Sequence, residues 1–179
     1  MATHHLKNLG ELGPALEEFL PRAVAALQVS LRDTIAEHAM VELVDRSPVG
    51  NPAVDPHPGK YRASHVPSAG QMVTRVLPNM PAYPIPGIPE VEAALAGAGP
   101  EVSAFIANAA ADERRPDSSY AGLLEGGRRQ YSRTATRTTM WIGSEQAPEG
   151  IYGPAILALK GMRATIEAQA VERAKRRLG

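Results

Sequence analysis

Prolines crowd one part of this sequence and limit what that part can fold into. Most of the chain's 16 prolines lie between residues 47 and 100. They are Pro48, Pro52, Pro56, Pro58, Pro67, Pro78, Pro81, Pro84, Pro86, Pro89 and Pro100. Because proline lacks a backbone donor, neither regular helix nor a central strand is expected there. We predict an extended arm, whose apolar residues Met80, Tyr83, Ile85 and Ile88 suit docking on a neighbour better than a solvated linker.

A long amphipathic helix is predicted before this arm, over residues 13–45. Its apolar residues recur every three or four positions and so share one face. They are Leu16, Leu20, Val24, Leu27, Leu31 and Ile35, followed by His38. The uninterrupted helix is expected to begin near Pro21, since proline is tolerated in a first helical turn. The helix should stop at residues 47–50, because Pro48 presets φ for a turn and Gly50 accepts a positive φ.

Shorter elements are predicted over the rest of the chain. We expect strands at residues 71–77 and 102–107, a short helix at 90–98, helical turns at 118–124, and a strand or hairpin at 128–142. A last helix should run from Gly153 or Pro154 to Leu178. The predicted fold class is α+β in one domain, residues 1–179. It has a long N-terminal helix, a small antiparallel β-sheet with a hairpin, a C-terminal helix, and a long proline-rich arm at about 47–100.

Composition narrows the class of protein further. The chain has no cysteine, which excludes a disulfide framework and a Cys-type zinc site. No apolar run approaches the length of a membrane span, so we expect a soluble chain made in a cytoplasm. Alanine supplies much of the apolar content, and the core should be modest for 179 residues. Acidic residues dominate the first helix and basic residues the last, so these helices are expected to pair within a subunit or between subunits.

No familiar catalytic motif is present, and we expect no enzyme activity, cofactor or metal. His57, Asp55 and His65 form the one cluster that resembles metal ligands, but their spacing fits no metal motif. Glu125 beside two glycines lacks the second carboxylate or histidine that acid–base catalysis requires, and a cap or salt bridge is the simpler role. The sequence therefore favours a structural or binding protein.

Arginines gather around the predicted hairpin, together with Tyr131 and Trp141. The candidates to face DNA or a partner are Arg128, Arg129, Arg133 and Arg137. Arginine beside aromatic rings can contact a phosphate backbone. Alternatively, these side chains solvate the outer side of a strand, or meet acidic residues of an adjacent subunit. Zero net charge weakens a nucleic-acid-coating interpretation.

Three separated motifs occur in a fixed order. The first is Ser47-Pro48-Val49-Gly50-Asn51-Pro52 followed by Gly59-Lys60-Tyr61-Arg62-Ala63-Ser64; the second is Asn108, then Ser119-Tyr120-Ala121 and Leu124-Glu125-Gly126-Gly127; the third is Ser144-Glu145-Gln146-Ala147-Pro148-Glu149-Gly150. In order and spacing this set resembles the neck and tail-completion proteins of tailed bacteriophages, the head–tail joining or connector family. The resemblance covers most of the chain.

The resemblance implies a small α+β structural protein of the virion neck, assembled in the host cytoplasm. It would form a cyclic homo-oligomer, a hexamer or dodecamer, between the portal or adaptor and the tail-tube or terminator proteins. DNA would pass through it without sequence-specific contact, and no membrane would be involved. The residues expected at subunit or ring interfaces are Pro48, Lys60, Tyr61, Arg62, Met80, Tyr83, Ile85, Tyr120, Glu125, Gln146 and Pro148. The alternative function is a soluble monomeric or dimeric protein that binds nucleic acid through the basic hairpin.

Overall fold

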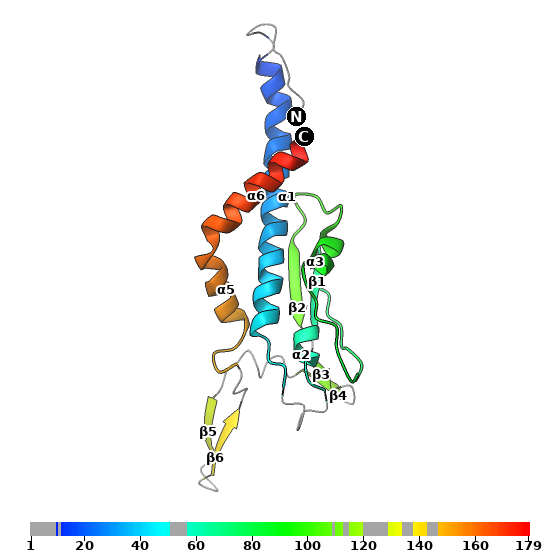
Figure 1. The fold of residues 1–179 in the computed structure, drawn as a ribbon, viewed down its shortest axis with the longest axis vertical. Coiled ribbons are helices and arrows are strands. Elements are labelled where there is room, and N and C mark those ends of the chain that lie inside the picture. Colours follow the sequence, from blue (N-terminus) through cyan, green and yellow to red (C-terminus); the bar gives the residue numbers. More distant parts are fainter. Residues whose placement is uncertain are drawn as a thin grey trace.

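A computed structural model describes residues 10, 12–50, 57–108, 110–112, 115–119, 129–133, 138–142 and 147–179. Between residues 111 and 142 that description covers the backbone only. The molecule is elongated, and one helix runs along most of its length (Figure 1).

Helix α1, Leu12–Arg46, is the axis of the fold. At 1.5 Å per residue its 35 residues span about 52 Å. Pro21 lies inside the helix, so the prediction that the uninterrupted part begins there was wrong. The carbonyl of Glu17, which would have accepted from residue 21, belongs to an exposed residue, and water can replace the missing bond. The predicted stop is confirmed, since α1 ends at Arg46 and Gly50 has a φ of +84°.

Two helices, rather than the single one predicted, form the C-terminal part. Helix α5 is Tyr152–Gly161 and α6 is Arg163–Leu178. Both pack on α1, and α6 makes the larger contact. The break falls at Met162, whose amide donates to the carbonyls of Ala158 and Leu159 and closes α5. Gly161, a poor helix former, directly precedes this break.

A small antiparallel sheet lies beside α1, together with helix α3, Ile88–Leu95 (Figure 1). Strand β1, His65–Ala69, pairs with β2, Ala104–Asn108. The predicted helix at 90–98 and strand at 102–107 correspond to α3 and β2. Strand β1 was not predicted because it contains Pro67. Among the described strands it pairs only with β2, so its other edge needs no ladder donor and tolerates proline.

The strand predicted at residues 71–77 does not form. After β1 the chain turns at Gly70, which has a φ of +78°. The Ser68 hydroxyl donates to the Gln71 carbonyl at 2.8 Å and accepts from the Val73 amide at 3.3 Å. Residues 71–76 are exposed, and only Leu77 in this stretch is buried. Side-chain bonding to the backbone thus replaces strand pairing here.

Two further strand pairs lie between β2 and α5. Strands β3, Ala111–Asp112, and β4, Arg115–Ser119, form one antiparallel pair. Ser118 and Ser119 therefore belong to a strand, against the predicted helical turns; residues 120–124 lie outside the described residues. Strands β5, Arg129–Arg133, and β6, Thr138–Ile142, pair antiparallel and confirm the predicted hairpin.

The core consists of two small clusters along α1, and the partly buried Ile106 packs against both. One combines α1 with α3: Ala36, Met40, Val44, Val91 and Leu95. The other combines α1 with α5 and the segments before it: Leu43, Tyr61, Ala110, Ala147, Ile151 and Ala155. Alanines supply half of the second cluster, and Ala36 is the one alanine in the first. The predicted α+β class, with a long first helix and a small antiparallel sheet, is confirmed.

Candidate interaction surface

Described residues of the three sequence motifs lie close together inside the molecule. Tyr61 from the first, Ala110 just after the second begins, and Ala147 from the third share one buried cluster. The Asn108 side chain joins two of them, since its amide donates to the Tyr61 carbonyl at 2.8 Å and its oxygen accepts from the Ala110 amide at 2.9 Å. In the isolated chain these motif residues therefore pack around the C-terminal end of α1 and join the segments that meet there.

Lys60 and Tyr61 fall within the predicted extended arm, but their backbone is helical. Residues Lys60–Ala63 form a short helix, α2, entered through Gly59 at a φ of +83°. The Lys60 side chain is only 2% exposed and donates to the Asn79 side chain at 2.9 Å. Tyr61 is 4% exposed within the core. Both side chains are buried within the chain, and Lys60 fastens the proline-rich segment to the body through Asn79.

A buried serine and histidine lie beside this cluster. The Ser47 Oγ is 2.6 Å from the Leu43 carbonyl and 2.8 Å from His65 Nε2. A hydroxyl has one proton, and the carbonyl can only accept. Ser47 therefore donates to Leu43, and His65 donates to Ser47 through Nε2–H.

This arrangement leaves the other ring nitrogen of His65 buried without a partner among the described residues. Tyr61 meets the ring edge-on at 5.5 Å, and Tyr152 lies at 6.1 Å. Burial lowers the pKa of His65 from 6.5 to about 4. The ring is a neutral core group at physiological pH.

The pair has the residue types of a nucleophile and its base, yet not their geometry. In a catalytic pair the serine donates to the histidine, and a third group orients the other ring nitrogen. Here the serine proton points to a backbone carbonyl, and Ser47 and His65 are 5% and 2% exposed. The pair is a structural link between the end of α1 and β1.

Other residues predicted at interfaces have mixed positions. Met80 and Ile85 are exposed, and Tyr83 is half-buried, with its hydroxyl bonded to the Pro78 carbonyl and the Met80 amide. Pro48 and Arg62 are half-buried and Pro148 is exposed. Arg129 and Arg133 lie on β5, paired along the backbone with Ile142 and Thr138. Outside the described residues lie Asp55, Tyr120, Glu125, Arg128, Arg137 and Gln146.

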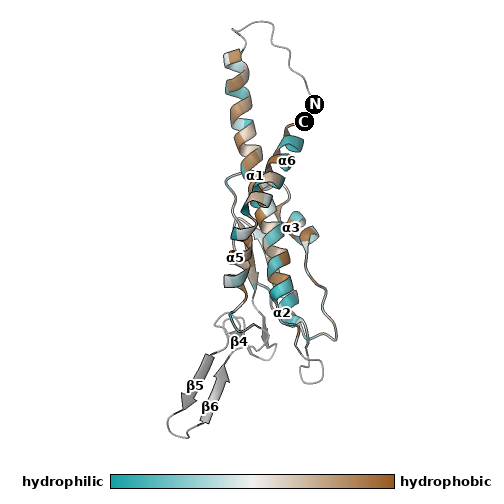
Figure 2. Cartoon of the chain, turned by 60° about the vertical axis from the view of Figure 1, so that its left-hand side comes forward, coloured by the Kyte–Doolittle hydropathy of each residue, from teal (hydrophilic) through white to brown (hydrophobic). Residues whose placement is uncertain are grey.

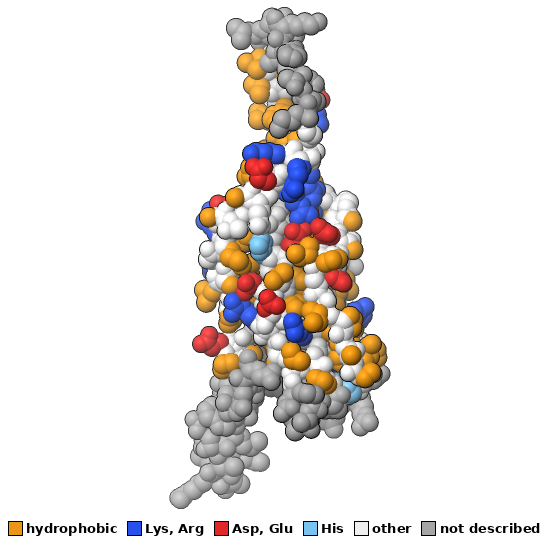
Figure 3. Space-filling view, viewed as in Figure 1, with side chains coloured by type: hydrophobic (Ala, Val, Ile, Leu, Met, Phe, Trp, Pro, Cys, Tyr) orange, Lys and Arg blue, Asp and Glu red, His pale blue; other side chains and the backbone are white. Residues whose placement is uncertain are grey.

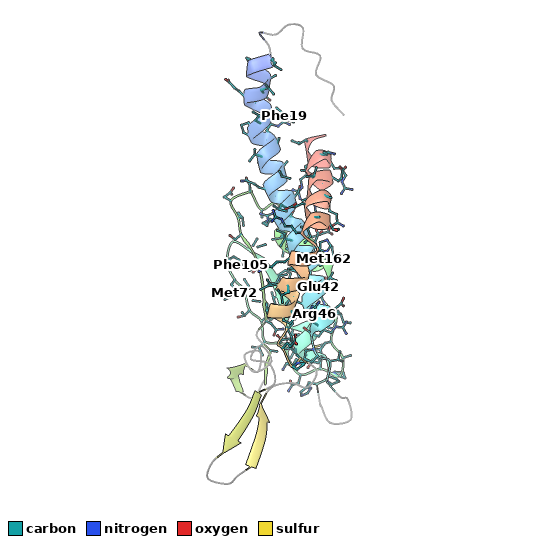
Figure 4. All side chains as sticks on the ribbon, turned by 90° about the vertical axis from the view of Figure 1, so that its left-hand side faces the viewer. Phe19, Glu42, Arg46, Met72, Phe105 and Met162 are labelled. Atoms are coloured by element: carbon teal, nitrogen blue, oxygen red, sulfur yellow. The ribbon has the colours of Figure 1, made fainter. Side chains whose placement is uncertain are left out.

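A long apolar surface lies on α1. The N-terminal half of this helix, before residue 28, extends past the C-terminal end of α6 and past the strands, and Phe19 lies in the part beyond α6 (Figure 4). We call its uncovered apolar residues the stripe: Leu16, Phe19, Leu20, Val24 and Leu27. Their exposure ranges from 42% to 54%. Figure 2 shows hydrophobic residues along this projecting part, and Figure 3 shows hydrophobic side chains on the face of it that this view displays.

An apolar groove continues from the stripe. It has a volume of about 710 Å³ and lies between α1, β2 and α5. Its apolar walls include Leu31, Ile35, Phe105, Tyr152, Ile156 and Leu159. Leu31 and Ile35 follow Leu27 at helical spacing, so one face of α1 carries the stripe and then one wall of the groove. A smaller extension, of about 300 Å³, reaches Lys160 and Arg163.

Sequence periodicity identified the α1 face but not the groove. Phe105 belongs to a strand 70 residues after Ile35 in sequence, and Ile156 to the C-terminal helix. The groove exists because α5 stands away from β2 along α1. Nothing in the local sequence pattern carries that information.

A charged cluster fixes the position of α6 on the other side of α1. Arg177 is 2.7 Å from Asp33, and Arg173 bonds to Glu37 at 2.5 Å. Asp33 also accepts from Arg32 at 2.7 Å. The expected pairing of the acidic first helix with the basic last helix therefore occurs within one chain.

Neither a metal site nor a membrane-spanning helix occurs among the described residues. They contain no group of three or more metal-ligating side chains placed to hold a metal ion. None of their helices combines the length and hydropathy needed to cross a bilayer. Comparison with protein-family models, characterised proteins and solved structures gives no match to this chain.

Proposed function

We propose that this chain is a structural subunit of the ring that joins head and tail in a tailed bacteriophage. The ring would sit between the portal or adaptor and the tail proteins, around the DNA passage. The supporting observation is the uncovered apolar surface of α1, which runs from the projecting stripe into the groove. A helix of this kind is marginal in water unless its apolar face is packed, so association with other chains would stabilise it.

The ordered motifs support the same proposal. They form a buried junction that links the end of α1 to α2, to β2 and to the segment before α5. Such a junction suits a rigid subunit that presents its long helix to neighbours. The Ser47–His65 pair is part of that junction, and we propose a structural role without catalysis.

Purified particles provide the decisive test. Virions or tailed particles made by the genome that encodes this chain are analysed by mass spectrometry, and by negative-stain imaging with an antibody to the chain. The proposal expects the chain in stoichiometric amounts and the antibody at the neck. Particles with complete necks that lack the chain would overturn it.

A second candidate function rests on the β5–β6 hairpin, where Arg129 and Arg133 lie four residues apart on one strand. A basic hairpin could bind nucleic acid as a soluble monomer or dimer. This function requires DNA affinity that falls steeply with salt. The double substitution Arg129→Glu and Arg133→Glu should abolish such binding, whereas Arg163→Glu, on exposed α6, should not.

A further inference from the structure

The stripe and the groove are two unfilled apolar surfaces of opposite shape on one chain. The stripe is a convex helical ridge with side chains at helical spacing. The groove is concave, lies between two helices and a strand, and has mainly hydrophobic walls. A helical ridge packs well into a groove of this kind, because side chains at i, i+4 and i+7 interdigitate with the walls.

The stripe cannot reach the groove of its own chain. Both surfaces lie on the single helix α1, the stripe before residue 28 and the groove from Gln28 onward. A continuous helix cannot fold back on itself, so a stripe that fills the groove must come from another molecule. A second copy of this chain is the molecule that carries a matching ridge.

Charge favours the same occupant. On the projecting half, Glu18 is paired with Arg22, and Glu17 has no ion-pair partner among the described residues. At the upper extension of the groove, Arg163 is paired with Glu167, and Lys160 has no ion-pair partner in the described part of the chain. One acid beside the stripe and one base beside the groove are thus left over, with opposite signs.

We propose that the groove is filled by the projecting half of α1 from a second copy of this chain, with Glu17 of the incoming helix directed toward Lys160. The contact joins two different surfaces, so an open assembly keeps one free stripe at one end and one free groove at the other. Contacts of this head-to-tail kind add subunits in sequence and form a ring when the rotation between subunits closes. This contact rests on the self-association that the proposed function requires, and it names the surfaces involved.

Cysteine crosslinking tests the contact directly, because the chain has no native cysteine. Full-length Leu20→Cys and Ile156→Cys variants are mixed in equal amounts and oxidised. We expect a disulfide-linked heterodimer. The matched control is Leu157→Cys, next to Ile156 on α5 but 68% exposed and not part of the groove. A crosslink of equal yield to Leu157→Cys, or none to Ile156→Cys, would overturn the contact.

Charge reversal provides a second test that does not depend on crosslinking. Glu17→Lys and Lys160→Glu should each weaken self-association by about tenfold, measured by analytical ultracentrifugation at low salt. The double variant restores opposite charges across every contact and should recover most of the affinity. Additive losses in the double variant would contradict the proposed pairing of Glu17 with Lys160.

The stoichiometry of the complex separates the remaining outcomes. A complex that stops at two copies, with both grooves filled reciprocally, would overturn the head-to-tail form. In purified particles, a groove cysteine that crosslinks only to a different protein would overturn self-docking while leaving the neck function intact. If the chain forms crosslinked rings but never enters particles, the neck function would be overturned and self-docking would stand.

Discussion

His65 shows how one buried ring can make stability depend on pH. Its pKa is about 4 in the folded chain and 6.5 ordinarily. Between these values the unfolded chain binds a proton that the folded chain does not, so the free energy of unfolding falls as pH falls. Above 6.5 both states are neutral, and below about 4 both are charged; the loss is confined to that window.

We predict that this ring alone lowers the free energy of unfolding by roughly 2 kcal/mol between pH 7.5 and pH 5. Urea unfolding at the two pH values measures it. The His65→Gln variant removes the titration and should lose roughly 2 kcal/mol less than the parent over the same interval. If the free energy of unfolding depends equally on pH in both proteins, His65 is not the source of the loss.

Met40 is the largest apolar side chain that is fully enclosed, at 0% exposure, and it packs in the α1–α3 cluster. Met40→Ala should lower the free energy of unfolding by about 3 kcal/mol, because the neighbouring alanines leave little to refill the cavity. Met72→Ala is the matched control, since Met72 is 66% exposed. This substitution should change the free energy of unfolding by less than about 0.5 kcal/mol. Chemical denaturation of both variants decides the point.

At the scale of elements, Arg32 connects α1 to the segment between α3 and β2. Its guanidinium donates to the carbonyls of Gly99 and Val102 at 2.7 and 3.0 Å, and to Ala98 at 3.2 Å. It also donates to Asp33, which in turn binds Arg177 of α6. One side chain thus links α1 to the α3–β2 segment directly and to α6 through Asp33.

We predict that Arg32→Met lowers the free energy of unfolding by about 3 kcal/mol, because it leaves the Asp33 carboxylate with one cation fewer and three carbonyls without their donor. Arg46→Met is the control on the same helix. Arg46 pairs with Glu42 four residues earlier at a more exposed site, and its loss should cost less than about 0.5 kcal/mol. Similar losses in the two variants would contradict the special role of Arg32.

Element boundaries were predictable where local chemistry sets them. The stop at residues 47–50 follows from Pro48 and Gly50, and the β5–β6 hairpin follows from its alternating pattern. Strand β1 and the break at Met162 were missed. Pro67 argues against a strand unless one knows that β1 is paired on a single edge, and that is a property of the sheet.

On the scale of the whole molecule, the projecting half of α1 is the part least supported by its own chain. Residues 12–27 contribute no buried side chain, whereas buried positions begin at Ser30. A stretch of four turns without packing opens readily, so its backbone amides should exchange quickly in the isolated chain.

Hydrogen exchange followed by mass spectrometry checks this expectation. In dilute isolated chain, amides of residues 16–27 should exchange at least 100-fold faster than those of residues 33–44. Upon assembly the first set should become protected while the second changes little. Strong protection of residues 16–27 in a demonstrably monomeric sample would show that the helix needs no neighbour.

By itself, the sequence determined the helical axis, its stop, the hairpin, and the apolar character of one α1 face. These depend on side-chain type and on spacing over a few residues, which act through short-range sterics and periodicity. Only the tertiary structure decided what each surface meets. It placed Lys60, Tyr61 and Ala147 inside, and it left Leu20 and Val24 uncovered. Burial is set by contacts between residues far apart in the chain, and no local pattern encodes them.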